Sequence, residues 1–324
     1  MINVALIGRN FVVDEMLSAM KMFDEIKLYA QYSRNYETGR AFADKYGIEK
    51  VYTDLDEMAR DNDIDAVYIA SPNCCHEDQA VMMLESGKHV ICEKPMNATY
   101  KGALRMIDAA EQNGVVFMEA MMNAHVPGTS KIKELLSEIG AVRRVNLSFC
   151  QYSSRYDKFK CGIVENAFDP TLHNGSFMDL GVYPVQLLLN LFGMPKSFNA
   201  SALYLPESID SQGSMICNYE GMQAILTWSK ITQGQLASEI QGEDGSILID
   251  KVSKPTVVTI VKRNGERTEY ETLAGKPVMY YEVNDFLDQI KGEKMSRFNE
   301  LSLMEAELME KARKQMGINF VKTV

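Results

Sequence analysis

The sequence predicts a two-domain protein, in which an α/β domain with a doubly wound parallel sheet precedes an α+β domain with an open, mainly antiparallel sheet. Apolar strand-like runs alternate with helical patterns up to about residue 120, as in a parallel sheet with crossover helices. From about residue 197, turn-forming pairs separate alternating segments, as in antiparallel hairpins. A length of 324 residues also favours two domains. We place them at 1–120 and 121–324.

The composition is that of a globular protein with an acidic balance, 46% hydrophobic with a net charge of −10. Such a surface argues against nucleic-acid or anionic-membrane partners, which require a basic face. The sequence has no apolar run of membrane-spanning length, and its start leaves no room for a signal peptide. Six cysteines without a C-x-x-C pattern indicate reduced thiols, a cytoplasmic location and no metal site. A reactive or metal-binding pair at Cys74-Cys75 is the alternative.

The first elements resemble the opening of a dinucleotide-binding Rossmann unit. The continuous apolar run Ile2–Ile7 predicts a strand covered on both faces, and Gly8 separates it from a helical pattern. Of the pattern G-x-G-x-x-G/A, only the first glycine is present in the run Gly8-Arg9-Asn10-Phe11-Val12-Val13. We expect Asn10 to tolerate the left-handed backbone of the second glycine, and Val13 to crowd the helix against the strand. A plain strand–helix turn is the alternative.

The second strand, 26–32, ends in Ser33 and Arg34. A cofactor with a free ribose 2′-hydroxyl usually meets Asp or Glu at this point. A hydroxyl and a guanidinium suit a 2′-phosphate instead, so we expect NADP rather than NAD, with NAD as the other possibility. An exposed loop arginine is the alternative interpretation of Arg34.

The remaining elements of this domain alternate regularly. Strands are expected at 66–70 and 115–118, with another that ends at Val90-Ile91, and helices at 40–46, 54–60, 76–85 and from the N-cap Thr99 to Gly114. Glu93, Lys94 and Pro95 follow the apolar pair at the end of one strand, and Pro95 stops it. Ligands of open α/β sheets bind at the carboxyl ends of the strands. Lys94 is therefore a candidate to contact a substrate oxygen, with a surface ion pair as the alternative.

The second domain begins with a helix at 130–139, a strand at 142–149 and an apolar helix at 176–192. Hairpin turns are expected at 220–221, 244–245 and 264–265, and two amphipathic helices close the chain. Asp179 and Tyr183 are four residues apart in the helix at 176–192, so we expect them to share a face.

Several motifs occur in a characteristic order. They are Ser33-Arg34, Ser71-Pro72-Asn73 with His76, Gly87-Lys88-His89-Val90 leading into Glu93-Lys94-Pro95, and Asp179-Leu180-Gly181-Val182-Tyr183-Pro184. In these motifs the whole chain resembles the Gfo/Idh/MocA oxidoreductases. The resemblance implies that Lys94 and Tyr183 are the catalytic pair and that Asp179 supports them. It also implies a cofactor site formed by Gly8, Arg9, Asn10, Phe11, Ser33, Arg34, Ser71, Pro72, Asn73, His76, Glu93 and Lys94.

Tyr183 stands where many members of that family have histidine. Tyrosine there is similar to trans-dihydrodiol dehydrogenase, glucose–fructose oxidoreductase and some pentose dehydrogenases, and makes an inositol dehydrogenase less expected. A tyrosine pKa of ~10 must fall for acid–base work near neutral pH, and a nearby ammonium lowers it. Tyr183 would then exchange the hydroxyl proton while Lys94 polarises the oxygen and hydride moves between the carbon and nicotinamide C4. A packed helix tyrosine is the alternative.

The expected function is therefore NAD(P)-dependent hydride transfer at an alcohol or carbonyl carbon of a sugar, cyclic polyol or dihydrodiol. The resemblance implies a homodimer or homotetramer formed through the antiparallel sheet. Met121 and Met122 are candidates for the wall of the substrate site, and His173 is expected at the surface. A catalytically silent NAD(P)-sensing regulator of the same fold is the alternative, and a member that has lost its cofactor is a third possibility.

Overall fold

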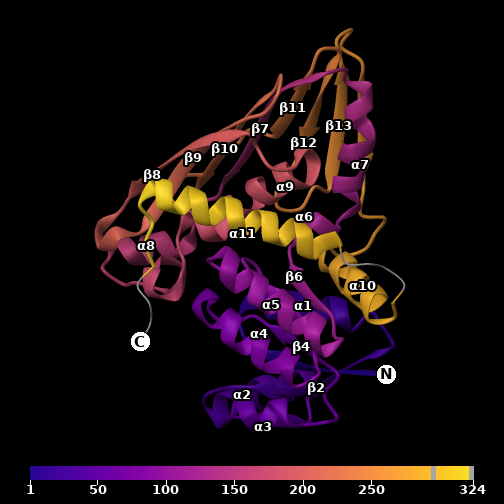
Figure 1. The fold of residues 1–324 in the computed structure, drawn as a ribbon, viewed down its shortest axis with the longest axis vertical. Helices are drawn as coiled ribbons and strands as arrows, with labels where there is room; N and C mark the ends of the chain where they lie inside the picture. Colours follow the sequence, from indigo (N-terminus) through magenta and orange to yellow (C-terminus); the bar gives the residue numbers. More distant parts are fainter. Residues whose placement is uncertain (293–296, 321–324) are drawn as a thin grey trace. The chain divides into compact units, whose positions relative to one another are not determined.

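The computed structural model describes residues 1–292 and 297–320 and divides into two compact units (Figure 1). The first unit contains Met1–Ala120 together with Met279–Glu300. The second contains Met121–Val278 and the chain from Leu301 onward. The division after residue 120 lies where the sequence analysis placed it, whereas residues 279–300 belong to the first unit and not, as expected, to the second.

The first unit is built on a six-stranded parallel sheet with the order β3-β2-β1-β4-β5-β6. The strands are β1 Ile2–Ile7, β2 Ile26–Tyr32, β3 Lys50–Tyr52, β4 Ala66–Ile69, β5 His89–Glu93 and β6 Phe117–Ala120. The order reverses between β1 and β4, which is the switch point where doubly wound sheets bind ligands. The predicted doubly wound sheet is confirmed, with β6 two residues later than expected.

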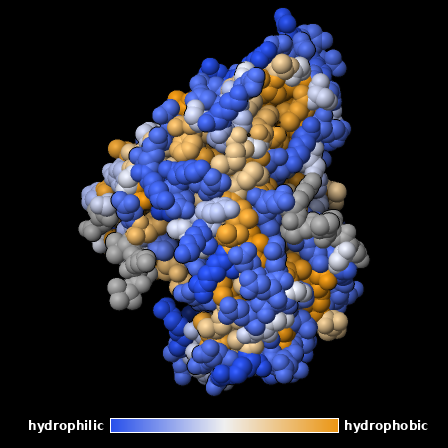
Figure 2. Space-filling view, viewed as in Figure 1, coloured by the Kyte–Doolittle hydropathy of each residue, from blue (hydrophilic) through white to orange (hydrophobic). Residues whose placement is uncertain are grey.

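Helices connect successive strands of this sheet. They are α1 Phe11–Met20, α2 Tyr36–Tyr46, α3 Leu55–Ala59, α4 His76–Glu85 and α5 Tyr100–Asn113. Helix α2 begins four residues earlier than predicted because the Asn35 side chain accepts a hydrogen bond from Thr38 N and caps it. Helix α5 has the predicted Thr99 cap and ends at Gly114 in the left-handed conformation. The surface over α2 and α3 is mainly hydrophilic (Figure 2), in keeping with the few residues that α2 buries.

Helix α10, Met279–Ile290, completes the first unit by packing against α1. The Tyr280 ring stacks on Phe23 with centroids 4.7 Å apart, and Lys291 pairs with Glu25 at 2.8 Å. Val283 and Phe286 are buried on the same helix. The expected boundary was wrong for this helix because its apolar periodicity identifies a buried face but not the partner that covers it.

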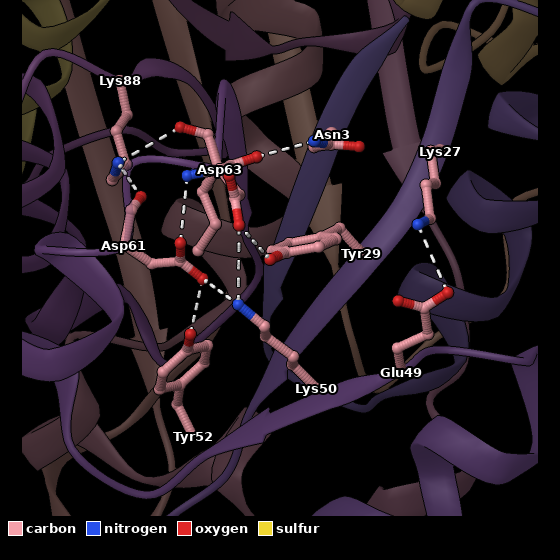
Figure 3. Close-up of polar contacts among 10 residues, drawn as sticks. Asn3, Lys27, Tyr29, Glu49, Lys50, Tyr52, Asp61, Asp63 and Lys88 are labelled. Atoms are coloured by element: carbon pink, nitrogen blue, oxygen red, sulfur yellow. Dashed lines mark hydrogen bonds and ion pairs between the residues drawn. The ribbon is translucent and has the colours of Figure 1, made fainter.

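A polar cluster ties together the amino-terminal edge of the first sheet (Figure 3). Lys50 and Tyr52 contact the Asp61 carboxylate at 2.9 and 2.5 Å, and the Lys88 ammonium donates to the Asp61 and Ile64 carbonyls at 2.7 and 3.1 Å. Burial lowers the pKa of Lys88. The Gly87-Lys88-His89-Val90 run therefore places its lysine at the edge opposite to the carboxyl ends of the strands, where it joins loops.

The second unit contains an eight-stranded sheet with the order β14-β13-β12-β11-β7-β10-β9-β8. The strands are β7 Val142–Cys150, β8 Ser197–Tyr204, β9 Asp210–Asn218, β10 Gln223–Ser229, β11 Ser238–Gly242, β12 Gly245–Ile249, β13 Val257–Lys262 and β14 Arg267–Glu271. All neighbours are antiparallel except β7 and β10. The three predicted hairpins are present, and the expected mainly antiparallel sheet is confirmed.

Helices of the second unit are α6 Met122–His125, α7 Pro127–Leu135, α8 Ser154–Lys160, α9 Val182–Phe192 and, from Leu301 onward, α11 Arg297–Met316. Helix α9 packs on β7 and β10, and α7 packs on β13. Helix α8 was not predicted, because it is short and buries no residue. Within residues 1–292 and 297–320, no helix has the length and apolarity that crossing a membrane requires.

The predicted helix at 176–192 begins with a wide π-helical turn, Phe177–Gly181, directly before α9. Pro184 explains the change, because a proline inside an α-helix lacks an N–H and its ring clashes with the carbonyl four residues earlier. A wide turn, in which hydrogen bonds join residues five positions apart, accommodates both the missing N–H and the bulk of the proline ring. The spacing of Asp179 and Tyr183 therefore differs from the ideal α-helical spacing from which a shared face was expected.

We expect Phe286→Ala to lower the free energy of unfolding by about 3–5 kcal/mol, because it removes a buried aromatic side chain from α10. Lys291→Ala breaks an exposed ion pair and should cost less than about 1 kcal/mol. Urea unfolding of both variants measures the difference. Equal effects would show that α10 does not stabilise the protein through its apolar face.

Candidate active site

The turn after β1 depends on Gly8, the first glycine of the predicted motif. Its φ is +123°, and a Cβ at this position would lie 2.5 Å from the Ala70 carbonyl oxygen. A side chain is therefore excluded both by backbone conformation and by the approach of the chain after β4. Gly8 holds the two strands of the switch point close together where a dinucleotide would bind.

Asn10 does not replace the second glycine in the way that was expected. Its backbone is extended, with φ −84° and ψ 176°, and its side chain caps α1. The Asn10 Oδ1 accepts from Val12 N and Val13 N at 3.0 and 3.2 Å. Asparagine is among the preferred N-cap residues, so capping competes successfully with the left-handed conformation. Val13 is fully buried behind this turn, whereas Phe11 is exposed.

Two arginines lie close to the carboxyl end of β2. Arg9 Nη1 donates to the Thr38 carbonyl at 3.4 Å, which brings it to the first turn of α2. Ser33 is buried, and its hydroxyl lies 3.3 Å from that of Thr38. Arg34 is exposed beside it. The guanidinium of Arg9 therefore joins the Ser33-Arg34 pair at this corner, where a ribose 2′-substituent of a dinucleotide is expected.

His76 was expected to contact the cofactor, but its ring is fully buried. Nδ1 lies 3.1 Å from the Pro95 carbonyl oxygen, and Nε2 lies 2.9 Å from that of Ser71. The ring therefore links the loop after β4 to the loop after β5. The Ser71 hydroxyl donates to Gln79 Oε1 at 2.7 Å, and Asn73 begins a 3₁₀ turn to Cys75. His76 thus positions the neighbouring candidate residues.

Lys94 follows β5, which ends at Glu93 as Pro95 predicted. Buried Tyr68 donates its phenol to Glu93 Oε1 at 2.6 Å. On the other side of Pro95, Met96 N donates to the buried Glu119 carboxylate at 2.7 Å. Burial, with the Glu93 charge as a second cause, raises the pKa of the Tyr68 phenol, so it stays a donor. The backbone that carries Lys94 is therefore fixed at both ends.

Tyr183 lies in the first turn of α9 in the second unit and is almost completely buried. Asn123 Nδ2 donates to the Tyr183 carbonyl at 3.0 Å and to that of Val252 at 3.1 Å. The Phe149 ring meets the Tyr183 ring edge-on, with centroids 5.4 Å apart. Asn123 therefore fixes the backbone of the tyrosine, and Phe149 limits the orientation of its ring.

Asp179 lies in the wide turn and pairs with Lys230, whose Nζ is 2.8 Å from Asp179 Oδ2. The buried Asp210 carboxylate accepts from the Ser176 hydroxyl at 2.7 Å and from Phe177 N at 2.6 Å, which fixes the start of the turn. Burial raises the pKa of Asp210 against the effect of these donors. No motif marks a buried polar residue distant in sequence from its partner, so Lys230, Asp210 and Asn123 were not predicted.

The structure thus groups the predicted residues within each unit. The first unit brings Gly8, Ser33, Ser71 and Lys94 to the carboxyl edge of one parallel sheet. The second carries Asp179 and Tyr183 on one anchored helix start. Of the other predicted positions, Met121 is buried, and His173 stacks on Phe320 with centroids 4.7 Å apart. Among the described residues no cluster of His, Cys, Asp and Glu could hold a metal ion.

Comparison with known proteins matches both halves of the chain to one family. Residues 2–121 match the oxidoreductase family model with an NAD-binding Rossmann fold, and residues 129–248 match the Gfo/Idh/MocA C-terminal domain. The chain belongs to the Gfo/Idh/MocA family. This Gfo/Idh/MocA protein is an NAD(P)-dependent oxidoreductase, as the motifs predicted.

Relatives align with this Gfo/Idh/MocA chain over nearly its whole length. It is 45% identical over 321 residues to scyllo-inositol 2-dehydrogenase (NADP(+)) IolU of Bacillus subtilis, covering 98% of each chain. It is 28% identical to trans-1,2-dihydrobenzene-1,2-diol dehydrogenase of Mus musculus, covering 98% of this chain and 96% of that protein. The first similarity weighs against the expectation that Tyr183 disfavours an inositol.

The same fold occurs in a solved structure of KijD10, a 3-ketoreductase from Actinomadura kijaniata in complex with NADP and TDP-benzene. The TM-score is 0.87 at 23% identity, with 97% of this chain and 98% of that chain covered. This likeness shows the fold of the Gfo/Idh/MocA protein over both units.

We expect His76→Ala to lower the free energy of unfolding by about 1–3 kcal/mol, because it removes the buried ring that contacts the Pro95 and Ser71 carbonyl groups. Loosening of the two loops should also weaken NADP+ binding. Urea unfolding and a fluorescence titration measure the two effects. Asp78→Asn, on the exposed side of the same helix, serves as control. Wild-type stability and affinity in His76→Ala would contradict the linking role.

Proposed function

We propose that the protein is an NADP-dependent dehydrogenase that oxidises a secondary alcohol of a cyclic polyol, and that it catalyses the reverse reduction. The observation that carries this proposal is the 45% identity, over 98% of both chains, to an NADP-dependent scyllo-inositol 2-dehydrogenase. An alcohol carbon gives a hydride to nicotinamide C4, and the hydroxyl loses a proton. The product is the ketone, so the step needs one base and one group that polarises the oxygen.

We assign the base to Tyr183 and the polarising group to Lys94, with Asp179 as the supporting carboxylate. Tyr183 has a fixed backbone and a ring in contact with Phe149, which suits a group whose proton transfer requires a defined orientation. The rigid end of β5 likewise fixes the backbone of Lys94. The bound nicotinamide would supply the hydride acceptor, and these residues would orient the alcohol and accept its proton.

The proposed cofactor site lies at the carboxyl edge of the first sheet. Gly8, Asn10 and Phe11 form the phosphate turn there, the loop after β4 supplies Ser71, Pro72 and Asn73, and the end of β5 supplies Glu93. Arg9 and Arg34, with Ser33 and Thr38 between them, supply cationic and hydroxyl groups that suit a 2′-phosphate. This charge distribution supports NADP as the preferred cofactor, in agreement with the cofactor named for the Bacillus relative.

A dihydrodiol is the second candidate substrate, because the mouse relative with 28% identity is a trans-dihydrodiol dehydrogenase. Both substrate classes present vicinal hydroxyl groups on a six-membered ring, so the same base and polarising group serve either.

We further propose a homodimer or homotetramer formed through the second unit's sheet, and a cytoplasmic location. The six cysteines are thiols in the structure, which fits a reducing compartment.

We expect Tyr183→Phe to lower kcat for scyllo-inositol oxidation by a factor on the order of 10² to 10⁴, because the reaction loses its base. The absorbance of NADPH during turnover measures the rate. Tyr270→Phe, on a strand of the same unit, should keep the wild-type rate. Unchanged turnover of Tyr183→Phe would remove this residue from the mechanism.

We expect Arg34→Gln to reduce the ratio of kcat/KM for NADP+ over NAD+ by about 10- to 100-fold, the cost of one charge-assisted phosphate contact. Arg60→Gln removes an exposed arginine elsewhere in the unit and should leave the ratio unchanged. Initial rates with each cofactor give the two constants. An unaltered preference in Arg34→Gln would place the 2′-phosphate elsewhere.

A further inference from the structure

We infer that Lys230 is a positioning residue that holds the Asp179 carboxylate in place for catalysis and joins it to the aromatic segment 156–168. The inference rests on the proposed role of Asp179. Lys230 lies directly after β10 and is 51 residues beyond Asp179 in the sequence. No sequence motif singled it out.

The contacts of the Lys230 ammonium define this role. Nζ donates to the Ala167 carbonyl at 2.7 Å, pairs with Asp179 Oδ2 at 2.8 Å and lies 5.4 Å from the centre of the Phe168 ring. The Lys230 side chain is 3% exposed, whereas that of Asp179 is 36% exposed. The ammonium therefore closes the inner side of the carboxylate and leaves part of its outer side accessible.

The backbone of Lys230 is also fixed, so the ammonium has a defined origin. Lys230 N donates to the Ser211 carbonyl at 2.9 Å, and Ser153 N donates to the Lys230 carbonyl at 2.9 Å. A lysine is rarely buried without a partner, because removing its charge from water is costly. Here the carbonyl, the carboxylate and the ring face compensate that cost, and each restricts where the ammonium lies.

Asp179 needs such an anchor because it lies in the wide turn, where regular α-helical spacing is lost. The buried Asp210 carboxylate fixes the start of the turn through Ser176 and Phe177, and Lys230 is close enough to Asp210 to interact with its charge. The buried Lys230 ammonium thus interacts with Asp179 in the turn and with Asp210 at the start of β9.

The same ammonium connects Asp179 to an aromatic cluster. The Phe168 ring stacks on Tyr156 and Phe159, with centroids 6.0 and 5.4 Å apart, and the cluster includes Ala167 and Ile209. Lys230 binds the backbone of Ala167 and faces the Phe168 ring. A displacement of segment 156–168 would therefore move the Lys230 ammonium and, with it, the Asp179 carboxylate.

The described contacts of the Lys230 ammonium are with groups of the protein, so Lys230 affects the reaction through Asp179. We expect Lys230→Met, which keeps the length and removes the charge, to lower kcat for scyllo-inositol oxidation by about 10- to 100-fold, because small misplacements of catalytic groups are costly. KM for scyllo-inositol should change by less than about threefold. Lys230→Arg keeps the cation and should recover part of the lost rate. Lys196→Met, which breaks an exposed ion pair of the same unit, is the matched control.

The decisive comparison uses Asp179→Asn as background. If Lys230 acts through Asp179, adding Lys230→Met to Asp179→Asn should change kcat by less than about threefold, because the residues work as a unit. An equal loss of rate in both backgrounds would overturn the inference, and so would a wild-type kcat in Lys230→Met. If Lys230→Met does not fold, Lys230→Gln replaces it in the same comparison with the same two outcomes.

Amide hydrogen exchange separates this inference from the proposed function. Lys230→Met should accelerate exchange in peptides covering 177–183 relative to Lys196→Met, at equal global stability. Unaltered exchange there would overturn the anchoring of Asp179. If Lys230→Met accelerates exchange at 177–183 but the wild-type protein does not oxidise scyllo-inositol with NADP+, the proposed polyol substrate is wrong and the anchoring of Asp179 by Lys230 still holds.

Discussion

The first unit depends on the close approach between Gly8 and the Ala70 carbonyl, which leaves no room for a Cβ. This contact sets the separation of the chain after β1 from the chain after β4, the two strands at which the sheet order reverses. The loops after β4 and β5 are joined to each other by the buried ring of His76. The positions of Ser71 and Lys94 therefore follow from backbone packing and from one histidine, before any cofactor is considered.

Most of the fold was predictable from the sequence, because apolar periodicity and turn residues act locally. The strand at 2–7, the helix at 76–85 and the hairpin turns all follow from their own residues. Helix α10 was assigned to the wrong unit, since a periodic pattern does not name its partner. The wide turn at 177–181 was also missed, although Pro184 was visible, because a proline can equally end a helix.

The candidate site was predictable in part. The motifs pointed to Lys94, Asp179 and Tyr183, whereas the side chains that fix them, Glu119, Asn123 and Lys230, carry no signal in sequence order. For His76 the motif gave a position but not its surroundings. The resemblance assigned this residue to the cofactor, whereas its buried ring contacts the Pro95 and Ser71 carbonyls. Asn10 illustrates how one residue type serves two purposes, and its capping of α1 excludes the backbone conformation that was expected of it.

The wide turn also restricts how this protein can vary. Such a turn is equivalent to one extra residue within an α-helix, and each helical residue accounts for about 100° of rotation. Loss of a single residue between Phe177 and Gly181 would therefore convert the wide turn into regular α-helix and bring Pro184 into conflict with the carbonyl four residues before it. Loops at the hairpin ends tolerate changes in length, but this segment does not, so its residue count is as constrained as the identity of its side chains.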